Sequence, residues 1–362
     1  MSSESLEQRG VAPVPRGTGG GNRSRAGSGA GSGEGLLRIG FAVVLAAGLL
    51  SIPWLGPSYR FLSVAISSEI AAVALYGLSI LFGQGGILSL AQAALMGVGS
   101  YTAAILAARA GLGFWAAMPF AMLTAALVAG VLGLPSLRVG GHQFIIITFA
   151  FGALFSIVLT NGGSFTGAAS GLDVGSVGLL LGFKLDKLQN YYLVVTVALL
   201  LSILATQLIS ASGYGRILRA IRENEVLARA VGIRTGLHKL GAFMLSGVFA
   251  GIAGVLQAYF LGHISPTLYG GFPSVYLALM VMLGGPRLLY GPLVGAAIVS
   301  FLPEILNIDP VDARIAYGTG LIVVIMAMPG GVTGGIIALF RWLASRTQKR
   351  RPAGAPAVAS SE

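Results

Sequence analysis

The stretch LGAFMLSGVFAGIAGVLQAYFLGHISPTLYGGFPSVYLALMVMLGGP, residues 240–286, decides the fold because it contains no Asp, Glu, Lys or Arg. A helix that crosses the hydrocarbon core of a membrane needs about 20 predominantly apolar residues, so this stretch has room for two such helices. Its apolar residues run continuously rather than at every second position, which indicates helices and not the strands of an outer-membrane barrel. The sequence therefore predicts a helical integral membrane protein.

The composition of the whole chain has the same character. Of its 362 residues, 55% are hydrophobic and 10% are charged, and its mean hydropathy is +0.84. A soluble domain carries about 25% charged residues, so most of this chain does not face water. The absence of cysteine excludes disulfides, thiol nucleophiles and thiolate metal sites. No Gly-x4-Gly-Lys-Ser/Thr motif is present, so the chain is not expected to bind ATP through a P-loop.

Further uncharged stretches lie on both sides of the first one. They predict an all-α, polytopic transmembrane fold with about ten spans. Glycine and proline at 284–286 and 291–292 interrupt residues 272–306, so this part forms either two short spans or a re-entrant hairpin. The predicted spans lie near 37–56, 62–82, 86–108, 114–134, 143–160, 191–210, 238–261, 272–285, 290–306 and 315–340.

The two ends of the chain differ from the middle. Residues 1–35 are rich in Gly, Ser, Pro and Arg and cannot bury an apolar core, so they are predicted to be a disordered tail. Residues 36–342 form the transmembrane domain, and residues 343–362 form a basic, then Pro- and Ala-rich tail. With ten spans, most of the 23 Lys and Arg residues fall on the side that holds both termini. By the positive-inside rule this side is the cytoplasm.

The cytoplasmic loop 211–239 is the most informative segment between spans. From Arg216 to Val231, apolar residues recur at helical spacing beside arginines, and Gly232 follows as a helix stop. The pattern predicts one short amphipathic helix. Such a helix either lies on the membrane surface, with its arginines against anionic headgroups, or docks in a groove of a soluble partner, where Glu223 and Glu225 meet basic groups.

Several runs in order along the chain resemble one family. GRILRAIRENEVLARAVGI (215–233) and KLGAFMLSGVFAGIAGVLQAYFLGHISP (239–266) are similar to the permease subunits of ABC importers for branched-chain amino acids, above all the M-type subunit of the channel pair. The other runs that carry the resemblance are GQGGILSLAQAALMGVGSYTAAIL (83–106), LRVGGHQFIIITFAFG (137–152), FTGAASGL (165–172), SVYLALMVMLGG-x5-GPLVGAA (274–297) and YGTGLIVVIMAMPGG (317–331).

The resemblance implies one half of a heterodimeric channel in the bacterial cytoplasmic membrane. The partners it implies are a homologous second permease, two ABC ATPase subunits and an extracytoplasmic solute-binding protein. ATP is used by the partner subunits, and this chain is expected to bind no cofactor and to be no enzyme. The implied substrates are leucine, isoleucine and valine, while urea, short-chain amides and other small solutes remain open because closely similar permeases carry them.

The resemblance also implies that the loop helix is a coupling helix seated on an ATPase subunit. An apolar stripe then supplies contact area, and charges fix the orientation. The positions that match the family here are Arg216, Arg219, Ala220, Arg222, Glu223, Glu225, Ala228 and Gly232.

Polar residues inside predicted spans are candidates for the transport pathway. Glu69 is the clearest, because a charge at the centre of a span costs about 2.5–3.5 kcal/mol. It is either a site along the pathway or a group with a structural partner. The full candidate set is Glu69, Ser89, Gln92, Gln143 and Thr148.

Small residues on one face of the span near 238–261 allow close helix approach. Gly247, Gly251 and Gly254 serve either packing inside the chain or contact with the second permease.

Two other classes of protein compete with a permease subunit. An autonomous ion-coupled transporter predicts carboxylates along the pathway and an internal repeat, but only Glu69 fits clearly and no repeat is evident. A membrane enzyme would need a catalytic group, and His142, His238 and His263 are isolated, so no metal or acid–base site is predicted. The basic residues lie beside the spans rather than among exposed aromatic residues, which argues against a nucleic-acid partner.

Overall fold

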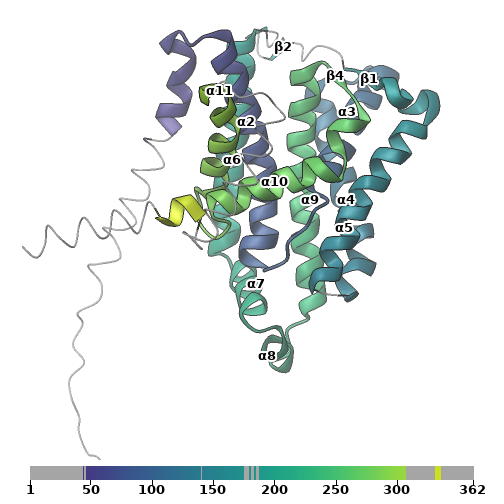
Figure 1. Cartoon of the computed structure of the whole chain (residues 1–362), viewed down its shortest axis with the longest axis vertical. Coiled ribbons are helices and arrows are strands. Elements are labelled where there is room, and N and C mark those ends of the chain that lie inside the picture. The colour runs from purple at the N-terminus through teal and green to yellow at the C-terminus, as the bar shows by residue number, and fades with distance from the viewer. Residues whose placement is uncertain are drawn as a thin grey trace, which may run out of the picture. The chain divides into compact units, whose positions relative to one another are not determined.

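The computed structural model describes residues 44, 46–139, 141–174, 179–180, 183–184, 187–306 and 331–335. The chain separates into two compact units, Met1–Gly48 and Leu49–Glu362, and the elements labelled in Figure 1 belong to the second. Both predicted tails, 1–35 and 343–362, lie outside the described residues.

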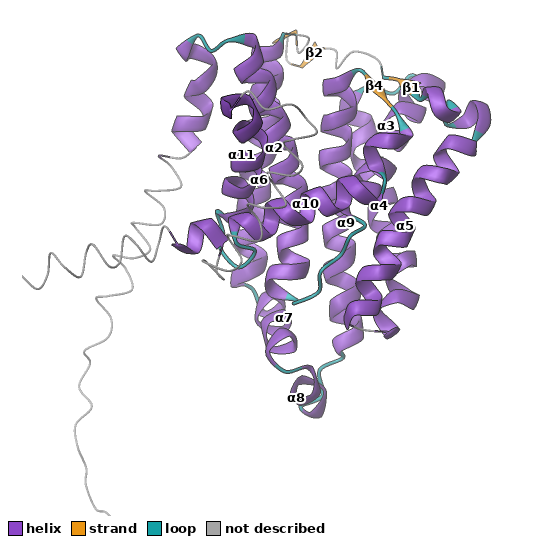
Figure 2. Cartoon of the chain, viewed as in Figure 1, coloured by secondary structure: helices purple, strands orange, loops and turns teal. Residues whose placement is uncertain are grey.

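The regular secondary structure in the described part of the second unit is helical apart from four two-residue strands (Figure 2), which confirms the predicted all-α class. Its α-helices are α2 (Tyr59–Ser79), α3 (Gln92–Ala110), α4 (Phe114–Val139), α5 (Gly141–Asn161), α6 (Leu188–Ala211), α7 (Gly213–Glu223), α8 (Glu225–Ala230), α9 (Thr235–Leu261), α10 (Gly271–Gly284) and α11 (Gly291–Leu306). Shorter helical turns are η1 (Ile52–Leu55), the π-helical η2 (Ile80–Gln84), η3 (Gly163–Phe165), η4 (Ala168–Ser170) and η5 (Pro266–Tyr269). The strands are β1 (Leu172–Asp173), β2 (Leu179–Leu180), β3 (Phe183–Lys184) and β4 (His263–Ile264); β1 pairs with β4 and β2 with β3, both antiparallel.

Six helices of the described chain are long and apolar enough to cross a membrane, which confirms the polytopic prediction. They are Tyr59–Gln84, Gln92–Ala110, Phe114–Leu137, Gly141–Asn161, Leu188–Ala211 and Thr235–Leu261. These helices correspond to the predicted spans from 62–82 to 238–261. The count of ten is not confirmed, because much of 37–56 and most of 315–340 lie outside the described residues.

The predicted break in residues 272–306 is confirmed, and it separates α10 from α11. These helices have 14 and 16 residues, about 21–24 Å at 1.5 Å per residue, so neither alone crosses a hydrocarbon core of about 30 Å. Figure 1 shows α10 running across the direction of α2 and α9. Glycines allow α10 and α11 to touch, because a Cβ on Gly284 would lie 1.9 Å from the carbonyl oxygen of Gly291.

Helix α9 packs against α2, α3 and α4, and its glycines determine how closely. A Cβ on Gly254 would lie 2.1 Å from the carbonyl oxygen of Met96 in α3. A Cβ on Gly251 would lie 2.6 Å from the carbonyl oxygen of Ala121 in α4, and one on Gly247 would meet Ala125 of the same helix at 2.7 Å. Of the two predicted roles of these glycines, packing inside the chain is therefore the one observed.

Residues 85–91 are not helical, so the prediction that a span begins at residue 86 is wrong. Gly86 has a φ of +72°, which turns the chain out of the preceding π-helix. Three backbone N–H groups at the start of α3 are then bound by hydroxyl groups instead of helical carbonyls. Leu90 N donates to Thr148, Ala91 N to Ser89, and Ala93 N to Ser274, at 3.0–3.2 Å. Irregular backbone is tolerated at membrane depth where protein groups satisfy it in this way.

Candidate functional site

The loop between α6 and α9 contains two helices, so the predicted single helix over 216–231 is wrong. Asn224 has an extended backbone (φ −155°, ψ 102°), and its side chain accepts a 2.9 Å hydrogen bond from Leu227 N. This is an N-cap, and a residue that caps a new helix cannot also continue the previous one. The predicted stop is confirmed, since α8 ends at Ala230 and Gly232 follows with a φ of +88°.

Helix α7 is held against the transmembrane helices. Leu218 and Ile221 on its apolar face are buried. Arg222 donates a hydrogen bond to the carbonyl oxygen of Gly83 at the end of η2, and its aliphatic stem lies where a Cβ on Gly86 would be. Burial lowers the pKa of the Arg222 guanidinium, and the positive charge of Arg287 lowers it further. Arg222, a predicted coupling residue, thus faces the inside of the protein.

A tyrosine and two other arginines also hold α7 in place. The hydroxyl of Tyr214 donates to the carbonyl oxygen of His238 at 2.8 Å, and the two rings stack. Arg216 donates to the carbonyl oxygen of Ala211, and Arg219 to that of Ser210, at 3.1 and 2.9 Å. These carbonyl groups lie at the C-terminal end of α6, where the helix dipole favours positively charged side chains.

Helix α8 is tied to α9 by charged groups. Glu225 accepts hydrogen bonds from Arg229 at 2.7 Å and from Lys239 at 2.6 Å, and Arg229 also donates to Thr235 at 3.0 Å. Burial alone would raise the pKa of Glu225, but the hydrogen bonds from Lys239 and Arg229 outweigh it, so the pKa lies below its ordinary value. Both carboxylate oxygens of Glu225 are therefore engaged within the chain.

The outward face of α8 is apolar. Val226, Leu227 and Val231 are 78, 61 and 70% exposed. The remaining predicted coupling positions divide between two environments: Ala220 and Glu223 are exposed, whereas Ala228 is buried. The apolar stripe predicted for one helix is thus split, because the α7 part is covered by the protein and the α8 part is not.

The candidate pathway residues do not form one cluster. Glu69 is 4% exposed and lies between α2 and α6, where its Oε2 accepts a 2.9 Å hydrogen bond from Thr196. Among the described residues, its Oε1 has no hydrogen-bond partner.

Gln92 connects three helices at the buried start of α3. Its amide nitrogen donates to the carbonyl oxygen of Ala74 at 2.8 Å, and its amide oxygen accepts from the hydroxyl of Ser246 at 2.9 Å. Ser89 and Thr148 bind the N–H groups of the neighbouring loop, as described above, whereas Gln143 is exposed on α5. Three of the candidates thus organise residues 85–93.

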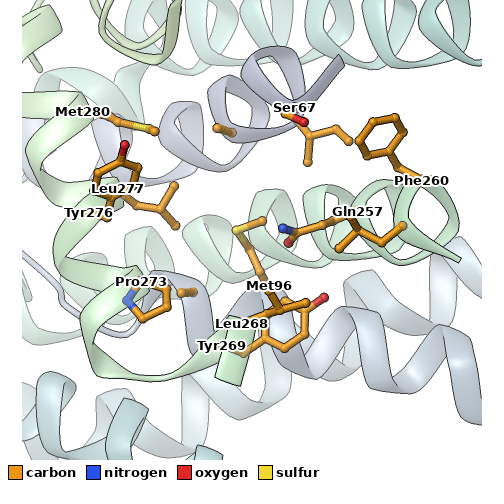
Figure 3. Close-up of a pocket in the computed structure, with 14 residues that line it drawn as sticks. Ser67, Met96, Gln257, Phe260, Leu268, Tyr269, Pro273, Tyr276, Leu277 and Met280 are labelled. Atoms are coloured by element: carbon orange, nitrogen blue, oxygen red, sulfur yellow. The ribbon is translucent and has the colours of Figure 1, made fainter. Parts of the chain in front are cut away.

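A cavity of about 200 Å³ opens between α2, α3, η5, α9 and α10 (Figure 3). Its wall includes Ser67, Met96, Gln257, Leu277 and Met280, and none of the five candidate pathway residues. Gln257 lies near the end of α9, and α9 begins beside α8, so the cavity is in the half of the helix bundle away from α8.

Sequence reasoning missed several residues that matter at these sites. Asn224, which caps α8, and Lys239, which pairs with Glu225, both lie within the loop 211–239. Neither contact was evident in the sequence, because the partners depend on how the loop folds. Gln257 did have a sequence signal: it is a polar amide in the longest uncharged stretch of the chain.

Comparison with known proteins gives consistent results. The sequence profile of the family described as branched-chain amino acid transport system / permease component matches residues 60–329. The chain is 28% identical over 279 residues to the high-affinity branched-chain amino acid transport system permease protein LivM of Escherichia coli (strain K12), which covers 71% of this chain and 66% of that protein. The chain thus spans slightly less than two thirds of that relative.

Two further relatives indicate the breadth of the similarity. The probable branched-chain amino acid transport permease protein LivH of Methanocaldococcus jannaschii is 27% identical over 289 residues, 74% of this chain and 90% of that protein. The ribose import permease protein RbsC of Escherichia coli (strain K12) is 29% identical over 119 residues, 32% of this chain and 37% of that protein. No solved structure matches.

Proposed function

This chain belongs to the family of branched-chain amino acid transport system permease components, and from that premise we propose that it forms one half of the translocation channel of an ABC importer for leucine, isoleucine and valine. The observation that carries the proposal is the match over residues 60–329, which includes all six long apolar helices except the first residue of the first helix. These helices make the chain a multi-pass membrane protein. A homologous permease supplies the other half of the channel.

Two ATPase subunits on the cytoplasmic side drive the transport, and α8 docks on one of them. The exposed Val226, Leu227 and Val231 support this role, because an apolar face that large next to charged residues needs a cover. Binding to a membrane surface scales with the apolar area that is buried, and a helix of only six residues offers little such area, so a groove on a protein is the better cover. The two glutamates then differ in role: Glu223, which is exposed at the end of α7, meets the partner's basic groups, and Glu225 anchors α8.

Contacts in the loop give ATP-driven motion a route into the spans. Glu225 and Lys239 connect α8 to α9, while Arg222 connects α7 to the end of η2. A displacement of the α7–α8 loop therefore acts on α9 and on residues 85–91 together. Helix α9 packs on α2, α3 and α4, so a shift of α9 moves the walls of the channel.

The proposed substrate rests on similarity to LivM and LivH, whose names describe them as branched-chain amino acid transport permeases. A separate extracytoplasmic binding protein delivers the substrate and contributes most of the selectivity. Similarity to a ribose permease indicates that the same helical machinery serves other small solutes, so urea and short-chain amides are the alternative substrates.

The test is uptake of labelled leucine at low concentration in the source organism, in a strain that lacks this gene and in that strain carrying the gene on a plasmid. We expect uptake to be lost in the deletion strain, restored by the plasmid, and reduced by excess isoleucine or valine. A tagged chain should also co-purify with an ABC ATPase. Unchanged leucine uptake with ATPase co-purification would redirect the substrate to urea or amides, and purification without any ATPase would refute the importer.

A further inference from the structure

Apolar side chains make up most of the described wall of the cavity between α2, α3, α9 and α10, and its polar groups are those of Ser67, Gln257, Tyr269 and Tyr276. Its apolar lining includes Ile70, Met96, Phe260, Leu277 and Met280, contributed by four helices that are distant in sequence (Figure 3). No Asp, Glu, Lys, Arg or His is among the described residues that line it. Since an unpaired charge is costly in such surroundings, the wall disfavours a solute with a net charge.

The wall also contains the polar amide of Gln257. The described residues provide no hydrogen bond to the amide of Gln257, which Figure 3 shows between Ser67 and Met96. The hydroxyl of Ser67 donates to the carbonyl oxygen of Ser63 at 3.0 Å and therefore offers the cavity only an acceptor. A half-buried amide without a partner is unfavourable unless a water or a ligand binds it.

The size of the cavity limits what it can hold. An apolar protein cavity of about 150 Å³ binds benzene, so about 200 Å³ has room by proportion for roughly eight non-hydrogen atoms, about the size of valine or leucine. Aromatic amino acids are larger. The cavity lies in the half of the helix bundle opposite α8. In the proposed importer this is the extracytoplasmic half, where the solute arrives.

We propose that this cavity is a binding site, within the permease itself, for one aliphatic amino acid without net charge, whose side chain packs on Met96, Leu277 and Met280 and whose polar end binds Gln257. This inference rests on the proposed function and adds to it that the permease, and not only the binding protein, selects among substrates. The cavity is then an intermediate stop between the binding protein and the cytoplasm.

The test uses a substitution whose larger side chain fills the cavity, and it compares the uptake of two amino acids of different size. Ala71, in the cavity wall, is replaced in Ala71→Leu, and the matched control is Ala150→Leu, at an exposed position of α5 that does not line the cavity. Initial uptake of labelled leucine and alanine is measured below saturation in the deletion strain, with an unchanged binding protein and with membrane levels checked by immunoblot.

We expect Ala71→Leu to lower the ratio of leucine to alanine uptake by roughly tenfold, because the side-chain space of leucine is lost. Ala150→Leu should leave the ratio unchanged. An unchanged ratio in Ala71→Leu at a normal membrane level would overturn the proposal, since a cavity filled by lipid or by the second permease does not distinguish the two solutes. If the wild type carries neither amino acid, the proposed function fails first and this inference fails with it.

A second variant covers the case in which Ala71→Leu does not accumulate. Gln257→Met preserves the size of the side chain and removes no hydrogen bond within the described protein, so its folding should be unaffected. We expect it to lower leucine uptake roughly tenfold at a normal membrane level, because the polar end of the solute loses its partner. Wild-type uptake by Gln257→Met would likewise overturn the proposal.

Discussion

Lys239, in the first turns of α9, donates a 2.6 Å hydrogen bond to Glu225, the first residue of α8 and fourteen positions earlier in the chain. The side chain of Lys239 is only 14% exposed, so the pair is partly shielded from water. Arg229 binds the other oxygen of the same carboxylate. One glutamate therefore sets the position of the whole α8 helix, whose apolar face is otherwise uncovered.

Reversing the charge at Glu225 should stop transport without removing the protein from the membrane. In Glu225→Lys, three cations come together and α8 loses its anchor, so we expect ATP-dependent leucine uptake to fall at least tenfold, roughly the effect of breaking a partly buried charged pair. The control is Glu304→Lys, which makes the same charge change at an exposed position of α11, outside the α7–α8 loop. Equal losses in both variants would mean that charge alone, and not the anchor, matters.

The anchor should also depend on pH. The pKa of Glu225 lies below its ordinary value of 4.5, so its contribution is complete above about pH 4.5 and declines as the pH falls through the lower folded value. The chain has no cysteine, so a spin label at Val231→Cys reports the motion of α8 alone. We expect an immobile label at pH 7 and a mobile one once the pH is below the folded pKa of Glu225, whereas with Glu225→Gln added the label should already be more mobile at pH 7 and change little with pH.

The apolar face of α8 should control binding of the ATPase. Burial of a large aliphatic side chain is worth about 1.5–3 kcal/mol, so the double variant Val226→Ser and Leu227→Ser should weaken ATPase binding by roughly 100-fold or more. Co-purification at increasing ATPase concentration measures this. Leu237→Ser, at an equally exposed residue outside α8, should bind normally. Normal binding by the double variant would assign α8 to the membrane surface instead.

Arg222 should matter for coupling rather than for docking. Its bond to the carbonyl oxygen of Gly83 links α7 to η2, which leads into residues 85–91, so Arg222→Ala should still bind the ATPase but carry less leucine for each ATP hydrolysed. We expect a decrease of roughly tenfold in that ratio, about the effect of losing one charge-assisted hydrogen bond. Arg216→Ala serves as the control, because Arg216 is exposed and its hydrogen bond goes to the end of α6 and not to η2. If Arg222→Ala lost leucine uptake and ATP hydrolysis in the same proportion, a coupling role for Arg222 would be contradicted.

Glycine at position 254 should be required for stability. A Cβ there would lie 2.1 Å from the backbone oxygen of Met96, so Gly254→Ala forces α3 and α9 apart and should cost about 1–3 kcal/mol. Gly236, in the same helix, has nothing within 4 Å of its Cβ position, and Gly236→Ala should be neutral or stabilising by up to about 1 kcal/mol. Thermal unfolding in detergent compares the two variants. If the two variants unfold at the same temperature, the close approach of α3 and α9 at Gly254 is not essential for stability.

Some of the candidate site could be predicted from sequence because the signal is local. Gly232 ends α8 through its own backbone conformation, and the glycines of α9 occur at a spacing that places them on one helix face. The start of α3 could not be predicted, because residues 86–91 are apolar and resemble the span that follows. Their conformation is fixed by hydroxyls on Thr148 and Ser274, which come from other helices.

The amino-acid sequence alone specifies a helical membrane protein and, through its ordered runs, indicates the family to which the chain belongs. The physical reason is that insertion in a membrane depends on the length and apolarity of each segment, which are properties of the segment alone. Only the tertiary structure decided which groups meet: Glu225 with Lys239, Arg222 with Gly83, and Gln257 with an apolar cavity. Such contacts join residues from different helices, and nothing in the pattern of one helix specifies its neighbour.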